Sequence, residues 1–192
     1  MERLTKNSLI KLSTIIMAVW LVSQGALAAT ALELIEQSLV EDSQIKQVSS
    51  DYVLAALGAP NNGEPTALVF DVREREEFAV SHLAGAIRLD PDTSAEQFVH
   101  DYGKRLAGVT PIFYCAVGKR SNTLAEAVAA YTNEQASPVL PVNLRGGIFR
   151  WHNENKPLEN TQGATDRVHP YDGYWRRLLI HPERSAYEPT QP

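Results

Sequence analysis

The chain has 192 residues, with 18 Lys and Arg against 23 Asp and Glu and a formal net charge of −5 at pH 7. This length fits one ordinary domain with short additions, and a hydrophobic fraction of 44% is typical of a globular protein. Binding of a nucleic-acid phosphate backbone needs clustered cations, and the sequence has no long basic run. We therefore do not expect nucleic acid as a partner.

The first 28 residues have the order of a cleavable secretory signal peptide. Three cations precede the apolar run of residues 12–22, and residues 26–28 form a small-residue cleavage pattern. We therefore predict cleavage after Ala28 and a periplasmic or secreted location. The alternative is an uncleaved N-terminal anchor that faces the periplasm. The apolar run is shorter than the ~20 residues of a membrane span, so we expect no stable span after cleavage.

Beyond a leader segment of residues 29–43 with loose helical spacing, apolar runs and helical patterns alternate along the chain. We expect strands over residues 45–49, 66–72, 85–89, 110–115 and 138–144. We expect helices over residues 51–57, 74–78, 95–107, 121–133 and 146–158. Ser50 or Asp51 is the expected cap of the first helix, a turn cluster over residues 58–65 ends it, and Ser121 or Asn122 is the expected cap of the helix over 121–133.

Strands that alternate with helices indicate an α/β fold, with a doubly wound parallel sheet and helices on both faces. We place this domain at residues 44–160. In such sheets ligands bind beyond the carboxyl ends of the strands. The C-terminal extension, residues 161–192, is turn-rich and carries one aromatic and aliphatic patch over residues 171–180, which we expect to pack on the domain as a short helix. The alternative is that this tail covers the site or binds a partner.

Cys115 is the only cysteine, and it stands at the end of an expected strand. A single cysteine excludes an internal disulfide and a thiolate-rich zinc site. Gly118 lets the backbone curl so that several N–H groups face one point, Lys119 and Arg120 add positive charge, and a helix begins directly afterwards. These features favour a reactive thiolate. The alternative is a buried structural cysteine.

Three segments resemble the motifs of the rhodanese family of sulfurtransferases. Residues 115–121, CAVGKRS, resemble the active-site loop; residues 71–87, DVREREEFAVSHLAGAI, resemble the first signature; and residues 142–151, VNLRGGIFRW, resemble the second. The resemblance covers residues 44–158 and implies a small α/β domain with about five parallel strands.

The resemblance also implies a role for each matching residue. Cys115 is the expected nucleophile, which accepts a sulfur atom and carries it as a persulfide. The expected anion-binding loop consists of Ala116, Val117, Gly118, Lys119, Arg120 and Ser121. The expected supporting network, which holds the loop by hydrogen bonds, consists of Asp71, Arg73, Glu77 and His82. Catalysis by His82 is the less favoured alternative, and no cofactor or metal is implied.

The implied reaction moves sulfur from a small sulfur-containing anion such as thiosulfate to cyanide or a thiol. A protein can also serve as sulfur donor or acceptor.

The sequence departs from the family at Ser81 and Ala84, and at Ala116, where many members that use thiosulfate carry a cation. Phosphatases of this fold form an alternative class, but their loop has five residues between cysteine and arginine, and this chain has only residues 116–119 there. A binding or sulfur-carrier module that acts with a protein partner is the remaining alternative.

Overall fold

The computed structural model describes residues 27–58 and 65–189. Most of the predicted signal peptide and most of the predicted turn cluster over 58–65 therefore lie outside the described residues. The predicted cleavage point after Ala28 lies within the helix that is described over residues 27–42. Within the described ranges, no helix is both long enough and apolar enough to cross a membrane.

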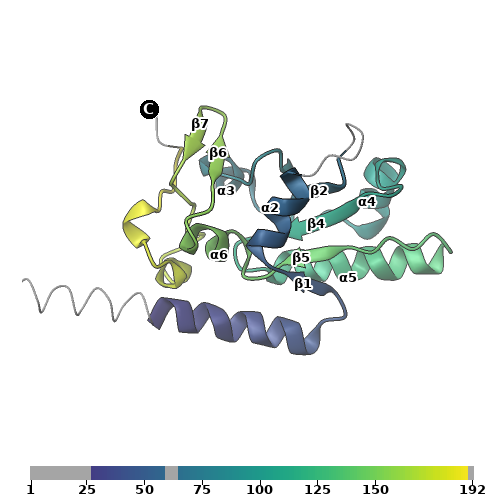
Figure 1. Ribbon diagram of the computed structural model, residues 1–192, viewed down its shortest axis with the longest axis horizontal. Helices are drawn as coiled ribbons and strands as arrows, with labels where there is room; N and C mark the ends of the chain where they lie inside the picture. The colour runs from purple at the N-terminus through teal and green to yellow at the C-terminus, as the bar shows by residue number, and fades with distance from the viewer. Residues whose placement is uncertain (1–26, 59–64, 190–192) are drawn as a thin grey trace, which may run out of the picture.

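Five parallel strands form one sheet in the order β1-β5-β4-β2-β3 (Figure 1). The strands are β1 (Lys46–Val48), β2 (Ala67–Asp71), β3 (Ile87–Arg88), β4 (Thr110–Tyr114) and β5 (Val142–Leu144). Strand β4 lies at the centre, where Phe113 pairs with Phe70 of β2 on one side and with Asn143 of β5 on the other. The predicted α/β fold with a parallel sheet is confirmed, and the cysteine follows the central strand.

Helices cover both faces of the sheet, as predicted. They are α2 (Ser50–Gly58), α3 (Arg75–Val80), α4 (Ala95–Tyr102), α5 (Lys119–Glu134) and α6 (Gly147–Asn153), with a 3-10 turn η1 (Gly103–Arg105). One core joins Phe70 and Phe113 of the sheet to Phe98 of α4 and Val128 of α5. The other core packs α2, α6 and the N-terminal helix against the opposite face, with Trp151 as its largest side chain.

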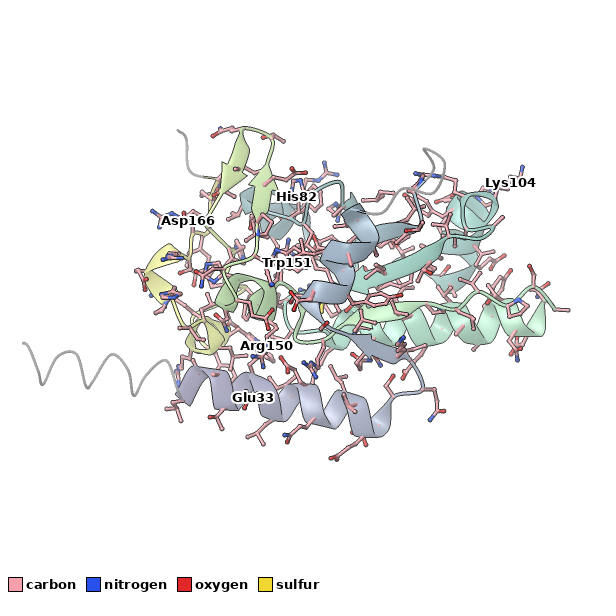
Figure 2. The ribbon with its side chains drawn as sticks, viewed as in Figure 1. Glu33, His82, Lys104, Arg150, Trp151 and Asp166 are labelled. Carbon is pink, nitrogen blue, oxygen red and sulfur yellow. The ribbon has the colours of Figure 1, made fainter. Side chains whose placement is uncertain are left out.

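The N-terminal helix of residues 27–42 is part of the folded unit. It runs along one side of the molecule, in purple in Figure 1, and Leu32 is fully buried against the core. Glu36 is also buried and accepts hydrogen bonds from Nε and Nη2 of Arg150, at 2.7 and 2.9 Å. Figure 2 shows Arg150 of α6 beside the N-terminal helix, which also carries Glu33. The helix therefore contributes a partly buried ion pair to the domain.

The C-terminal tail folds back on the domain. A hairpin of β6 (Leu158–Asn160) and β7 (Gly163–Thr165) spans the predicted boundary at residue 160, and two 3-10 turns follow, η2 (Trp175–Leu178) and η3 (Pro182–Arg184). The expected short helix in the aromatic patch is η2. Leu178 and Leu179 are buried, and Asn153 of α6 donates to the Leu178 carbonyl at 2.9 Å. The yellow turns of Figure 1 lie beside the start of the N-terminal helix.

The side chain of His152 in α6 contacts the same C-terminal tail. Its Nε2 lies 3.1 Å from the carbonyl oxygen of Asp166, and its side chain is buried beside Trp151. Burial lowers the pKa of His152 below its usual value, which favours the neutral imidazole that donates to this carbonyl.

Two predicted helix caps are wrong. Helix α2 begins at Ser50, and the hydroxyl of Ser49 accepts the N–H of Tyr52 at 3.3 Å, so the cap is Ser49 rather than Ser50 or Asp51. Helix α5 begins at Lys119, with Gly118 in the left-handed conformation as its N-cap. Neither Ser121 nor Asn122 caps this helix, because both lie inside its first turn.

Candidate active site

The cysteine loop begins where β4 ends. Tyr114 is the last residue of the central strand, and its carbonyl still accepts the N–H of Val72 from the neighbouring chain segment at 2.8 Å. Cys115 follows at once, with only 1% of its surface exposed. The parallel topology therefore puts the thiol at the carboxyl edge of the sheet, where α/β proteins bind ligands.

Helix α6 fixes the orientation of the first peptide groups of the loop. The carbonyl oxygens of Cys115 and Ala116 accept hydrogen bonds from the N–H groups of Ile148 and Phe149, at 2.9 and 3.0 Å. In a trans peptide the C=O and the N–H point in opposite directions. The N–H groups of Ala116 and Val117 therefore point away from α6.

Gly118 closes the loop against the buried Asn143. Its φ of 93° lies in the left-handed region, and an added Cβ would lie 3.2 Å from Nδ2 of Asn143. This Nδ2 donates to the Gly118 carbonyl at 3.0 Å and to Oε1 of Gln47 at 2.8 Å, while Ser121 donates to Oδ1 of Asn143 at 2.7 Å. The carbonyl of Gly118 is thus held on the core side of the loop.

The loop presents a run of free donors on its outer side. Within the described part of the chain, no acceptor takes a hydrogen bond from the backbone N–H groups of residues 116–121. The last three of these N–H groups belong to the first turn of the 16-residue helix α5, whose dipole favours negative charge there. Consecutive N–H groups of this kind form an anion-binding nest. The arrangement suits a thiolate or a persulfide at Cys115.

Arg120 is anchored by Glu77 of α3. Its Nη2 donates to both carboxylate oxygens of Glu77, at 3.0 and 3.1 Å, and the Glu77 side chain is only 2% exposed. Burial works to lower the pKa of Arg120, but the nearby Cys115 and Glu77 outweigh it and raise the pKa. Arg120 therefore stays positively charged beside the cysteine.

Asp71 and Arg73 form a fully buried pair at the end of the adjacent strand β2. Arg73 donates from Nε and Nη2 to the two carboxylate oxygens, at 2.8 and 2.6 Å, and from Nη2 to the Ser81 carbonyl at 2.6 Å. Burial opposes charge on Arg73, but Asp71 raises the pKa of the guanidinium above its usual value. Burial and the nearby Asp71 likewise raise the pKa of Tyr114, whose hydroxyl accepts the N–H of Leu83 at 3.1 Å. The pair braces β2 and β4 where the loop begins.

His82 lies outside this cluster of charged residues. Its Nδ1 is 3.0 Å from the Phe78 carbonyl, its ring stacks on that of Phe78 with centroids 3.8 Å apart, and its backbone pairs with Glu159. Figure 2 labels His82 beside α3 and the β6–β7 hairpin. The structure therefore brings Asp71, Arg73 and Glu77 together behind the loop, while His82 joins α3 to the hairpin.

A pocket of about 280 Å³ opens over Cys115. Its lining consists of Cys115, Ala116, Val117, Lys119 and Arg120 of the loop and Tyr171 and Trp175 of the C-terminal tail. The ring of Tyr171, which has a φ of 64°, lies 5.2 Å from the guanidinium carbon of Arg120. Both residues belong to the patch of residues 171–180, for which the sequence left open packing on the domain or coverage of the site. The aromatic patch was visible in the sequence, but no spacing placed it against a residue more than 50 positions earlier.

Gly147 is required where α6 meets the cysteine loop. It has a φ of 56°, and a Cβ there would lie less than 3.0 Å from the carbonyl oxygens of Cys115 and Ala116. We expect Gly147→Ala to lower the free energy of unfolding by more than the roughly 1–2 kcal/mol that left-handed strain alone would cost. The variant should also lower turnover, because the added Cβ forces the cysteine loop to move. Gly85→Ala is the matched control, since Gly85 has a φ of 69° with nothing within 4 Å of its Cβ position. Urea unfolding and turnover of both variants test this, and equal losses would contradict it.

The described residues include no group of three or more His, Cys, Asp or Glu side chains that could hold a metal ion. The candidate active site consists of Cys115 and its anion-binding loop at the carboxyl edge of the parallel sheet.

The sequence profile of the rhodanese-like domain family matches residues 51–154, which is more than half of the chain. This protein belongs to the rhodanese-like domain family. None of the curated proteins compared with the chain matches it.

Solved structures are similar to this chain at low identity. A protein from Bacillus halodurans is 23% identical, with 68% of this chain and 87% of that chain covered and a TM-score of 0.45. Thiosulfate sulfurtransferase from Pseudomonas aeruginosa is 20% identical, with 79% and 26% covered and a TM-score of 0.47. A Rhodopseudomonas palustris protein of unknown function, described as a possible tyrosine phosphatase, is 20% identical, with 68% and 93% covered and a TM-score of 0.46.

Proposed function

We propose that this protein is a sulfurtransferase that moves a sulfane sulfur through a persulfide on Cys115. With thiosulfate as donor, the thiolate attacks the outer sulfur, a sulfur–sulfur bond forms at Cys115, and sulfite leaves with the electron pair of the broken bond. In the second half-reaction cyanide takes the outer sulfur as thiocyanate and the thiolate returns. A small thiol, or the cysteine of a partner protein, is an alternative acceptor.

The observation that carries this proposal is the geometry of the loop around Cys115. The N–H groups of residues 116–121 have no acceptor among the described residues, and Glu77 holds the guanidinium of Arg120 beside the thiol. A persulfide is a larger anion than a thiolate, and several N–H donors can share its charge. The reaction needs no general base when the attacking group is already ionised. The proposed setting is periplasmic or secreted, in agreement with the predicted signal peptide.

Loop length separates this activity from phosphate ester hydrolysis. Residues 116–119 are the only ones between Cys115 and Arg120, whereas the loop of phosphatases of this fold has one more residue. We expect thiocyanate formation from thiosulfate and cyanide, with ping-pong kinetics, and no hydrolysis of p-nitrophenyl phosphate above that of a Cys115→Ala control. Hydrolysis of the phosphate ester without any sulfur transfer would overturn the proposal.

A further inference from the structure

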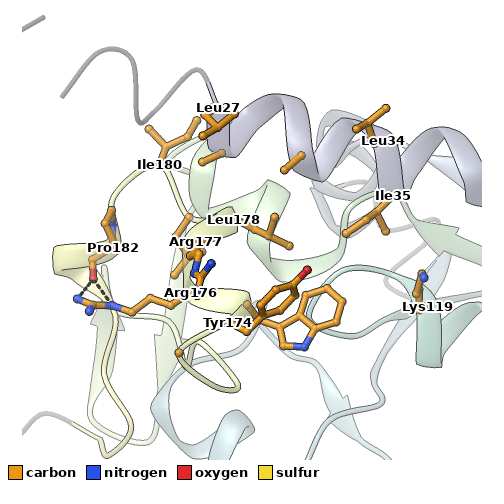
Figure 3. A pocket seen from close by; sticks show the side chains of 15 residues that line it. Leu27, Leu34, Ile35, Lys119, Tyr174, Arg176, Arg177, Leu178, Ile180 and Pro182 are labelled. Carbon is orange, nitrogen blue, oxygen red and sulfur yellow. Dashed lines mark hydrogen bonds between the residues drawn. The ribbon is translucent and has the colours of Figure 1, made fainter. Parts of the chain in front are cut away.

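The pocket over Cys115 continues into a larger groove. Lys119 and Trp175 line both, and the groove has a volume of about 720 Å³ against about 280 Å³ for the pocket. Figure 3 shows the groove between the N-terminal helix and the C-terminal tail, with Lys119 at one side and Leu27 at the other. A ligand that reaches Cys115 past Lys119 can therefore extend into this groove.

The groove has apolar walls that come from two distant parts of the chain. The helix supplies Leu34 and Ile35, and the tail supplies Leu178 and Ile180 (Figure 3). Leu34 is 63% exposed, so its side chain is available to a ligand. Buried hydrocarbon gains free energy in proportion to its area, so these walls favour a ligand with an apolar body.

The charged side chains along the groove select for a negative ligand. Lys119, Arg176 and Arg177 line it, and none of the described lining residues is acidic. Lys119 has no ion-pair partner among the residues that the structure describes, whereas Arg120 is already paired with Glu77. One uncommitted cation therefore stands where the groove meets the cysteine pocket.

Among the side chains that line the cysteine pocket in the described part of the chain, Lys119 is the one cation without an ion-pair partner. Besides Cys115, Lys119 and Arg120, its lining is Ala116, Val117 and two aromatic side chains. The position directly after the cysteine carries a methyl group in place of a cation. A singly charged donor with an apolar body matches both this lining and the groove.

We propose that the sulfur donor is an organic persulfide anion, R–S–S⁻, whose apolar body lies in the groove while its terminal sulfur reaches Cys115. This inference rests on the proposed sulfurtransferase function. The Cys115 thiolate attacks the terminal sulfur, a new sulfur–sulfur bond forms, the old one breaks, and R–S⁻ leaves with its electron pair. The sulfane sulfur is transferred with no external oxidant and no net proton.

Two thiosulfonate anions of the form R–SO₂–S⁻ test the role of the apolar body, because they share one reacting group and release R–SO₂⁻. With the full-length protein and cyanide as acceptor, we expect kcat/KM for octanethiosulfonate to exceed that for methanethiosulfonate by about 10-fold or more. Each buried methylene strengthens binding about 4-fold, so burial of only a few of the seven additional ones suffices.

Two variants of the N-terminal helix test whether the preference for octanethiosulfonate depends on the groove. Leu34→Glu adds a negative charge to the groove and should lower kcat/KM for octanethiosulfonate about 5-fold or more, with the methane compound within about 2-fold of wild type. Val40→Glu is the matched control, because Val40 is 54% exposed on the same helix and lies outside the groove lining. It should change neither value.

The possible results distinguish failure of the organic-persulfide proposal from failure of the proposed sulfurtransferase function. Equal rates for the two thiosulfonates, with Cys115 persulfide formed from both, would overturn the organic donor and point to another occupant of the groove, such as a partner polypeptide. Equal losses for both donors in Leu34→Glu would also overturn it. Failure to transfer sulfur from thiosulfate and from both thiosulfonates would instead refute the proposed function.

Discussion

Replacement of Cys115 by serine is expected to reduce sulfur transfer by on the order of 10³-fold or more, the scale seen when a catalytic nucleophile is removed. A serine hydroxyl stays protonated at neutral pH, and it cannot form the sulfur–sulfur bond of a persulfide. The loop offers no second sulfur nucleophile, because Cys115 is the only cysteine of the sequence.

The Cys115→Ser protein must remain folded for this result to be informative. Cys115 is buried, and serine has a similar shape, so the free energy of unfolding should change by no more than about 1–2 kcal/mol. Urea unfolding followed by circular dichroism measures that change beside the thiocyanate assay. A folded variant that keeps full turnover would refute the persulfide mechanism.

Asp71→Asn is expected to destabilise the protein by roughly 3–5 kcal/mol, the cost of removing one partner of a buried ion pair. Both side chains of the Asp71–Arg73 pair are fully buried. An amide nearly preserves the shape of the carboxylate but leaves the guanidinium without a counter-charge. The loss should appear as a lower urea midpoint, and failure to fold at all would agree with it.

An exposed ion pair provides the control. Asp51 pairs with Lys156, and the Asp51 side chain is 83% exposed. Asp51→Asn should therefore cost no more than about 1 kcal/mol. Equal costs at Asp71 and Asp51 would show that the buried pair does not support the end of strand β2.

The strands and most helices could be predicted because local patterns determine them. Residues 67–70 and 111–114 are continuous apolar runs, and the structure forms most of the two central strands, β2 and β4, from them. The predicted strand over 138–144 is shorter, since β5 covers only Val142–Leu144. Pro141 has no N–H to donate, and Leu140 is 81% exposed, so the chain joins the sheet only after the proline.

The candidate site could be predicted only where it is continuous in sequence. The loop of residues 115–121 carries its own signals, a glycine, two cations and a helix start. The cap assignment failed because a serine suggests a side-chain cap, whereas Gly118 allows the backbone itself to turn at a φ of 93°.

Contacts between residues that lie far apart in the sequence could not be predicted from any local pattern. Asn143 holds the loop from strand β5, and Tyr171 covers Arg120 from the tail. Glu36 reaches Arg150 across more than 100 positions. Each depends on how separate elements pack, which hydrophobic spacing along one element does not encode.

The direct test of the central claim is the mass of the protein after incubation with a sulfane-sulfur donor. Intact mass spectrometry, followed by peptide mapping without reducing agent, should show a gain of one sulfur atom on the peptide that contains Cys115, and cyanide should remove it. An unchanged mass with thiosulfate and with both thiosulfonates, or a stable phosphate on Cys115 after incubation with a phosphate ester, would contradict the account.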